Sequence, residues 1–305
     1  MNNNDPNYIL NTQLSSFGSE IANVLVDSNF IMKSFRYAQI GLEKESKNLK
    51  KFFDKIDDQT NTVPYISMWT AVVAKDVTKD STDYLPIQSK TVGPDEILTI
   101  ITDYLNQQLL WLIVKAYESF ERFNKDFYAC LGYTNRDLWL CSDFGKYRIG
   151  DLENKELDWY KAQVRKNIGK NNIKDILKRY RDIFHEYEKF ERQEPDNLLF
   201  WIKFIEFVRH TIVHANSSVQ CSELNEKLEK FTGVAFPSRK PELEKDQKQM
   251  IEYFTQVGEI YKLQVIDKDK LDIPDATVTY PTKYIIEKLT SHAYLTYKTS
   301  LEFFV

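Results

Sequence analysis

The segment LLFWIKFIEFVRHTIVHANSSV, residues 198–219, decides how the rest of the chain is interpreted. It begins as an apolar run whose hydrophobic residues recur at steps of one, three and four, which predicts a well-buried helix. Four polar or ionisable residues follow near its end: Arg209, His210, His214 and Asn216. Charged and imidazole groups on so apolar a helix are costly unless they are paired or used. The end of this helix is therefore the first candidate for a functional site.

Composition favours long helices over a β-rich fold. The chain has 305 residues, of which 42% are hydrophobic and 14% aromatic, and this is enough for a sizeable core. Its nine glycines and nine prolines are few for the many turns of a β-sandwich or barrel. We predict an all-α helical bundle with an N-terminal helical extension and at most a small β-hairpin.

The chain is expected to divide into two regions. Residues 1–94 form an N-terminal helical region without an assigned role, with one or two helices over residues 12–57. Within it, VPYISMWTAVVA (residues 63–74) is compatible with either a strand or a buried helix. The predicted boundary lies near Gly93-Pro94, and residues 95–305 form the second domain.

The second domain is predicted to be built around a buried helix from Pro94 to about Cys130, because apolar residues fall on all its sides. A loop with short helices follows over residues 132–160. The helix at the candidate site begins after Pro195-Asp196-Asn197, a proline break with a capping-type residue. The other predicted elements are helices over residues 172–192, after Asn216 to about Phe231, 243–257 and 281–304, and a short hairpin or extended loop over residues 262–280.

Several features indicate a cytoplasmic protein. Three scattered cysteines, Cys130, Cys141 and Cys221, favour reduced thiols. The start MNNNDPNY has neither a basic nor an apolar section, so we expect no signal peptide. The longest apolar run, residues 109–114, is far shorter than the roughly 20 residues of a membrane span. Because the net charge is −4, any nucleic-acid binding must depend on local basic clusters.

Arg209 and His214 have four residues between them, and the polar His210 follows the arginine. This resembles the R-x4-6-H motif of the HEPN superfamily, over about residues 95–305. The resemblance implies an all-α endoribonuclease that acts without a metal or cofactor, of the toxin or antiviral kind. It also implies RNA as substrate, a homodimer whose two motifs share one cleft, and an antitoxin or defence-system partner. Asn216 stands where some HEPN toxins carry a tyrosine, so control by modification of that tyrosine is not expected.

The residue types fit such chemistry. RNA carries its own nucleophile, the 2′-hydroxyl, so cleavage needs a base, an acid for the leaving 5′-oxygen and a cation for the phosphate. Histidine titrates near neutral pH, and the planar guanidinium of arginine binds two phosphate oxygens. By resemblance, His214 transfers protons, Arg209 binds phosphate and His210 supports them. On one unbroken helix Arg209 and His214 would lie about 140° apart, which also suits a dimeric cleft.

Further residues are candidates for supporting roles. Asn216 follows the motif, and Glu118 on the central helix is expected either to orient Arg209 or His214 or to pair with Arg122 within its own helix. The most basic stretch, residues 161–181, carries lysines that step by four: Lys166, Lys170, Lys174 and Lys178. On a helix they would form one stripe, which is either a solvated face or a track for RNA phosphates.

Three other interpretations of the motif stay open. In the first, the residues have structural roles only: Arg209 pairs with a carboxylate such as Glu206, and His210, His214 and Asn216 cap the helix end. Alternatively, His210 and His214, four residues apart, bind a metal ion, although no further ligands are visible. The third interpretation is a non-catalytic helical module that binds RNA or a protein through the same cleft.

Overall fold

Helices dominate the structure, a computed structural model that describes residues 5–53, 68–75, 84–92, 94–140, 143, 145–152, 154–167, 173–193, 197–235, 250–266 and 280–304. The α-helices are α1 (Pro6–Phe53), α2 (Pro94–Thr134), α3 (Leu157–Asn167), α4 (Ile173–Ile183), α5 (Tyr187–Glu191), α6 (Leu198–His214), α7 (Cys221–Ala235) and α9 (Tyr280–Ser300). Short 3-10 helices are η1 (Arg136–Leu138), η3 (Ile149–Leu152) and η5 (Leu301–Phe303). The predicted all-α class is confirmed, and the strands form small antiparallel sheets.

The chain divides into two compact units, one made of Met1–Ser28 with Leu109–Val305 and the other of Asn29–Gln108. Helices α1 and α2 contribute to both, because each runs without a break through the point of division. The units therefore do not follow the boundary expected near Gly93-Pro94, since α2 begins there inside the smaller unit. Residues 12–57, predicted as one or two helices, belong to the single helix α1 as far as Phe53.

The smaller unit contains a β-hairpin of strands β1 (Met68–Lys75) and β2 (Tyr84–Val92). Met68 pairs with Val92 at one end, and Lys75 pairs with Tyr84 at the other. The pairing register shifts between Val72 and Val73, which faces Pro86. Proline has no N–H to give to a ladder, so an irregular position of this kind tolerates it. The segment that was compatible with strand or helix is thus a strand from Met68 onward.

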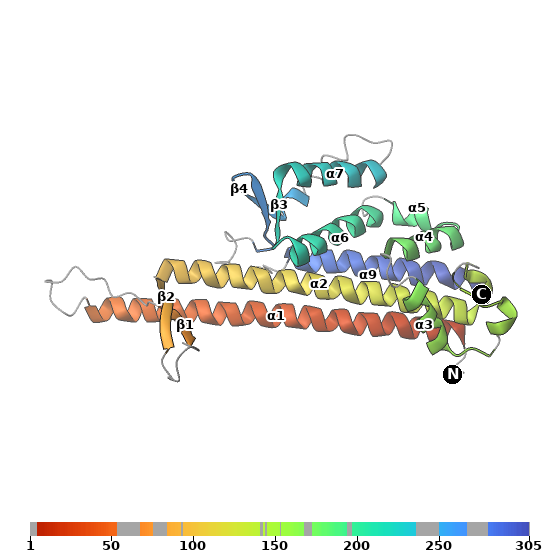
Figure 1. Ribbon diagram of the computed structural model, residues 1–305, viewed down its shortest axis with the longest axis horizontal. Coiled ribbons are helices and arrows are strands. Elements are labelled where there is room, and N and C mark those ends of the chain that lie inside the picture. Colours follow the sequence, from red (N-terminus) through yellow and green to blue (C-terminus); the bar gives the residue numbers. More distant parts are fainter. Residues whose placement is uncertain are drawn as a thin grey trace. The chain divides into compact units, whose positions relative to one another are not determined.

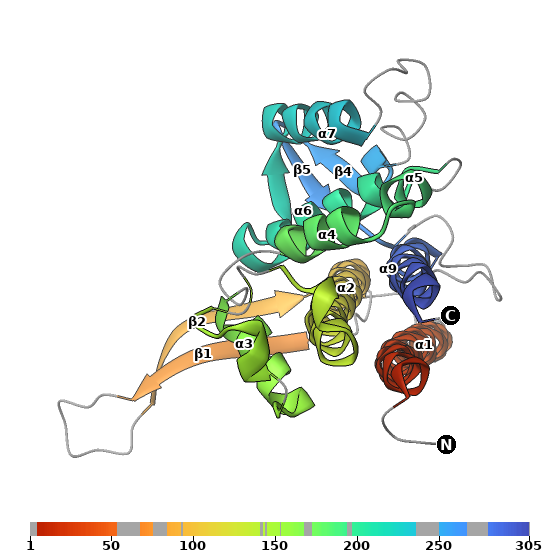
Figure 2. The same ribbon diagram turned by 90° about the vertical axis from the view of Figure 1, so that its right-hand side faces the viewer.

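The core of the larger unit forms where α2 meets α1 and α9. The ring of Phe17 on α1 lies 5.0 Å from that of Phe123, and Phe120 contacts the edge of His292 on α9 at 5.3 Å. Figures 1 and 2 show α9 alongside α2. The predicted burial of α2 is confirmed for residues such as Phe120, which is fully buried, but Trp111 remains 53% exposed.

Helix α6 packs against α7, α9 and a three-stranded sheet of β3 (Ser218–Gln220), β4 (Phe254–Val257) and β5 (Ile260–Leu263). Strand β5 lies between β3 and β4, and α7 covers the sheet (Figure 2). The prediction of a helix up to residue 257 was wrong at its end. A two-residue turn with Gly258 at φ +64° joins FTQV to IYKL, and this pattern favours a hairpin. Most of the expected hairpin over residues 262–280 lies outside the described residues.

A buried charge cluster ties α4, α5 and α9 together. Arg181 donates two hydrogen bonds to the carboxylate of Glu191, at 2.7 and 2.8 Å. His292 Nε2 lies 3.0 Å from the same carboxylate, and neither Glu191 nor His292 is exposed to solvent. Burial alone raises the pKa of Glu191, but the hydrogen bonds from His292 and Arg181 outweigh it and lower the pKa to about 2. The sequence analysis gave none of these three residues a role.

The structure tests part of the expectations that the cysteines are reduced and that no helix spans a membrane. Cys130 and Cys221 are free, and Cys141 lies outside the described residues. Burial raises the pKa of Cys130 to about 12, so this thiol stays protonated at neutral pH. Within the described ranges, no helix combines the length and apolarity needed to cross a membrane. The cytoplasmic location stays a prediction.

Replacing Glu191 by Gln should destabilise the folded chain by about 3–5 kcal/mol, because Arg181 loses its buried counter-charge. The pH dependence follows from the lowered pKa. Since Glu191 titrates at about 2 when folded and near 4.5 when unfolded, its stabilisation is complete above pH 4.5 and is lost as the pH falls toward 2. Urea unfolding measured between pH 7 and pH 2 should show this loss in the original chain and a smaller loss in the variant.

The matched control is Glu188→Gln, which removes the same charge from an exposed pair with Arg192 at 2.7 Å. Exposed pairs contribute less than about 1 kcal/mol, so this variant should unfold close to the original chain. Equal midpoints for the Glu188 and Glu191 variants would show that the buried cluster is not a stabilising element.

Candidate functional site

Helix α6 begins as the sequence predicts. The side chain of Asn197 accepts a hydrogen bond from the backbone N–H of Phe200 at 3.1 Å, and so caps the helix. Eleven of the 17 residues of α6 are buried, which confirms the predicted buried helix. Polar side chains occupy the remaining strip of its surface: Lys203, Glu206, Arg209, His210 and His214.

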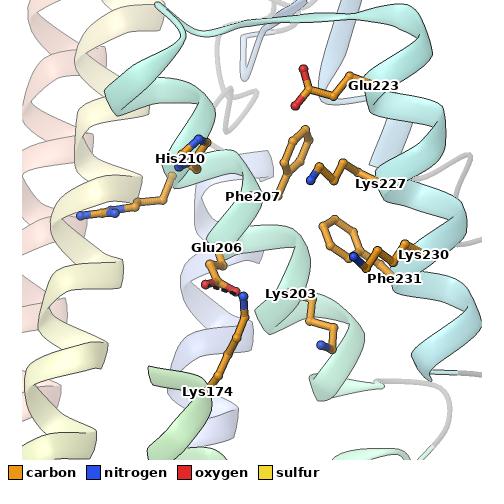
Figure 3. A pocket seen from close by; sticks show the side chains of 10 residues that line it. Lys174, Lys203, Glu206, Phe207, His210, Glu223, Lys227, Lys230 and Phe231 are labelled. Atoms are coloured by element: carbon orange, nitrogen blue, oxygen red, sulfur yellow. Dashed lines mark ion pairs between the residues drawn. The ribbon is translucent and has the colours of Figure 1, made fainter. Parts of the chain in front are cut away.

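A pocket of about 400 Å³ opens over this strip, between α6, α7 and the start of α4 (Figure 3). Among the described residues of its lining, five side chains are cationic and two are carboxylates, in a chain whose net charge is −4. The pocket is therefore a local basic cluster of the kind that nucleic-acid binding by an acidic chain requires. The lining residues are Lys174, Lys203, Glu206, Phe207, Arg209, His210, Glu223, Lys227, Lys230 and Phe231.

Arg209 reaches the pocket without a carboxylate partner in the described part of the chain. Glu206, the partner that one interpretation gave it, instead forms an ion pair with Lys174 at 3.1 Å (Figure 3). The Nε–H of Arg209 is buried and donates no hydrogen bond to a described residue. On α2, burial raises the pKa of Tyr117, Glu206 and Glu121 raise it further, and Arg209 opposes them. Arg209 thus lies near Tyr117, and no carboxylate among the described residues pairs with its charge.

His210 and His214 lie one turn apart on α6 with their rings in contact. The ring centroids are 4.7 Å apart and the planes are inclined by 47°. Both side chains are exposed, and neither hydrogen-bonds to a described residue, so they do not cap carbonyls there. His210 lines the pocket with Arg209, whereas His214 is outside its lining. The structure therefore places Arg209 and His210 in one pocket. His214 lies outside the pocket lining and is next to it only through the contact of its ring with that of His210.

Asn216 ends the helix. Its backbone is left-handed, with φ 50°, and Ser217 follows at φ 58°. The backbone N–H groups of Ala215 and Ser217 both donate to the carbonyl of Thr211, at 3.1 and 3.0 Å. Asparagine adopts this conformation more readily than most residues, which accounts for its presence at this position.

Glu118 lies exposed on α2 and forms no ion pair or hydrogen bond with Arg209 or His214. The alternative pair with Arg122 is also not formed, because Arg122 contacts Glu20 on α1 at 3.2 Å. A contact between helices has replaced the expected contact within one helix.

The four stepped lysines do not share one helix. Lys166 is exposed near the end of α3, while Lys174 and Lys178 are exposed on α4, and Lys170 lies outside the described residues. Helix α3 ends at Asn167 and α4 begins at Ile173. Lys174 alone of the three described lysines lines the pocket.

The sequence analysis missed the contribution of α7. Glu223, Lys227 and Lys230 recur at i, i+4 and i+7, so they share one face of this short helix, and this spacing was a usable signal. Lys203 on α6 was also missed, although it interrupts the apolar run. Burial lowers the pKa of Lys203, and the positive charges of Lys174 and Arg181 lower it further.

Under the metal interpretation, His210 and His214 would need a third ligand. Among the described residues, no group of three or more histidine, cysteine, aspartate or glutamate side chains is placed to hold a metal ion. His210 and His214 remain a pair of adjacent imidazoles.

The role of Asn216 as helix terminator is testable by stability. Asn216→Gly should unfold at nearly the same urea concentration as the original chain, because glycine adopts positive φ freely. Asn216→Val should cost about 1–2 kcal/mol, since a β-branched side chain is strained in the left-handed region. Equal losses for both variants would mean that the asparagine side chain, and not its backbone conformation, matters.

Comparison with known proteins leaves the family open. No family model, no curated protein and no solved structure matches this chain. The likeness to the HEPN superfamily therefore stays a prediction that rests on Arg209, His210 and His214.

Proposed function

We propose that this chain is a metal-independent endoribonuclease with its catalytic residues on α6. One observation carries the proposal: the guanidinium of Arg209, which pairs with no carboxylate among the described residues, shares a cation-rich pocket with His210, whose ring lies 4.7 Å from that of His214. A phosphate-binding cation and two adjacent proton carriers are the groups that RNA cleavage by the 2′-hydroxyl requires.

The reaction assigns one task to each group. One histidine takes the proton of the 2′-hydroxyl, whose oxygen then attacks the neighbouring phosphorus. The bond from phosphorus to the 5′-oxygen breaks, and the other histidine gives that oxygen a proton. The products are a 2′,3′-cyclic phosphate and a free 5′-hydroxyl. Arg209 holds the phosphate oxygens on which negative charge grows, because its planar guanidinium keeps its charge and binds two oxygens.

The wider biological setting follows the HEPN resemblance. By this resemblance, the chain is a toxin or antiviral effector in the cytoplasm, and an antitoxin or defence-system partner binds it. Arg209 and His214 lie about 140° apart around the unbroken helix α6, so one phosphate does not reach both along a single face. A homodimer in which the two motifs meet in one cleft would remove this separation.

Cleavage should proceed in EDTA. Purified protein incubated with labelled RNA and chelator should give fragments with 2′,3′-cyclic phosphate ends, identified by mass spectrometry. His214→Ala and His210→Ala should each slow cleavage by about 100-fold or more, the usual contribution of a proton-transferring group. Cleavage that is lost in EDTA and restored by zinc or magnesium would contradict the mechanism.

The control for this experiment is His185→Ala, because the His185 side chain is 95% exposed, pairs with Glu186 and does not line the pocket. It should cleave at the original rate. All variants should melt as the original chain does, because His210 and His214 are exposed. A much earlier melt of His214→Ala would instead make this residue structural.

A second candidate function is a non-catalytic module that binds RNA. It is favoured by the lysines of the pocket, which attract phosphate whether or not the histidines transfer protons. Tight RNA binding with no cleavage under any of these conditions would select it.

A further inference from the structure

The pocket extends beyond the Arg209–His210 pair to the side of α6 that faces α7. Figure 3 shows Lys227 and Lys230 on α7 directed toward α6, and Lys203 on α6 directed into the same space. None of these three lysines forms an ion pair with a carboxylate in the described part of the chain, although Glu223 also lines this side. The space between α6 and α7 thus carries unbalanced positive charge.

The positive charges near Lys203 indicate that an anion would be stable in this space. Lys203 is half-buried, and its burial together with the nearby cations Lys174 and Arg181 opposes its charge more than Glu206 and Glu191 favour it, so its pKa is lowered. A bound anion would relieve both the burial and the repulsion of this ammonium group, because opposite charge stabilises a partly desolvated cation. The geometry therefore favours an anionic ligand on the α7 side of α6.

An aromatic wall accompanies these lysines. The rings of Phe207 and Phe231 lie 5.9 Å apart in an edge-to-face arrangement. Phe207 is buried and fixed by the core, whereas Phe231 is only half-buried and turns part of its ring to the pocket. Basic groups beside a partly exposed aromatic ring match the pattern that binds single-stranded nucleic acid, with phosphates on the cations and a base stacked on the ring.

We propose that the space between α6 and α7 is a second RNA subsite, in which Lys203, Lys227 and Lys230 each bind a phosphate of the strand and Phe231 stacks on a base. The choice of RNA as ligand rests on the proposed function. Lys203 and His210 are seven residues apart, or about 10 Å along the helix, which a few nucleotides span. The strand therefore crosses α6 from the subsite to the Arg209–His210 pair. Its bases must be unpaired, because a base held in a duplex is not free to stack on a side chain.

The subsite is tested by binding, separately from cleavage. The probe is a fluorescent single-stranded 2′-O-methyl oligonucleotide, which has no free 2′-hydroxyl to attack, and its affinity is measured by anisotropy over a range of salt concentrations. The slope of log affinity against log salt is negative, and each lost lysine–phosphate contact makes it shallower by about 0.7. The double variant Lys227→Gln/Lys230→Gln should therefore flatten the slope by about 1.4.

The control double variant is Lys283→Gln/Lys298→Gln, which removes the same charge from exposed positions on α9. Its slope should equal that of the original chain. Phe231→Leu should weaken binding by about 5- to 100-fold, the range for loss of one stacked base, without changing the slope. Phe231→Tyr keeps an aromatic face and should retain the original affinity, which separates stacking from a general loss of packing.

The outcomes separate the subsite from the catalytic proposal. An unchanged slope in the Lys227/Lys230 variant, equal affinity of Phe231→Leu, or equally tight binding of a blunt duplex of the same sequence would overturn the subsite. RNA cleavage by these same variants at the original rate would then leave the ribonuclease proposal standing. Conversely, if the variants change the salt dependence of binding as expected but the chain cleaves no RNA, the result would support the subsite and reject only the ribonuclease proposal.

Discussion

The burial of α6 is the constraint on which the rest of the site depends. With eleven of its 17 residues inside the core, this helix leaves only one side of its surface for polar groups. Each buried aromatic or aliphatic side chain contributes about 1.5–3 kcal/mol, so rotation of the helix would expose several of them and bury Lys203, Arg209 and His210 in their place. The packing of Phe200, Phe204 and their neighbours thus fixes the direction in which the functional side chains point.

Local features of α6 were predictable, and its tertiary surroundings were not. Asn197 caps the helix as expected, because capping depends on residues within one turn. The separation of Arg209 from His214 also follows from helical geometry alone. The association of Arg209 with His210 in one pocket depends on where α7 and α4 lie, and no local pattern specifies that. Lys227 and Lys230 were identifiable as one face of a helix, but not as the wall opposite Lys203.

The basic stretch at residues 161–181 shows why charge counted along the sequence misleads. Its arginines have structural partners outside the stretch: Arg165 pairs with Asp126 at 3.2 Å, and Arg179 and Arg181 bind the carboxylates of Asp143 and Glu191. Arginine suits such sites because its planar fork makes two parallel hydrogen bonds to one carboxylate. The stretch therefore contributes less free charge than its composition indicates, and Lys174 is the one described member that lines the pocket.

The buried cluster around Glu191 and the pocket on α6 are joined through α4. Lys174 and Arg181 are seven residues apart on this helix, so they project from the same side, two turns apart. Arg181 is held in the core by Glu191, and this anchor fixes the position from which Lys174 contacts Glu206. Arg181 and Glu191 also act on Lys203 in opposite directions, the first lowering its pKa and the second raising it. The carboxylate of Glu191 therefore offsets part of the positive charge that Arg181 places near Lys203. In the proposed subsite, the affinity of Lys203 for a phosphate would depend on this buried pair as well as on the residues that line the pocket.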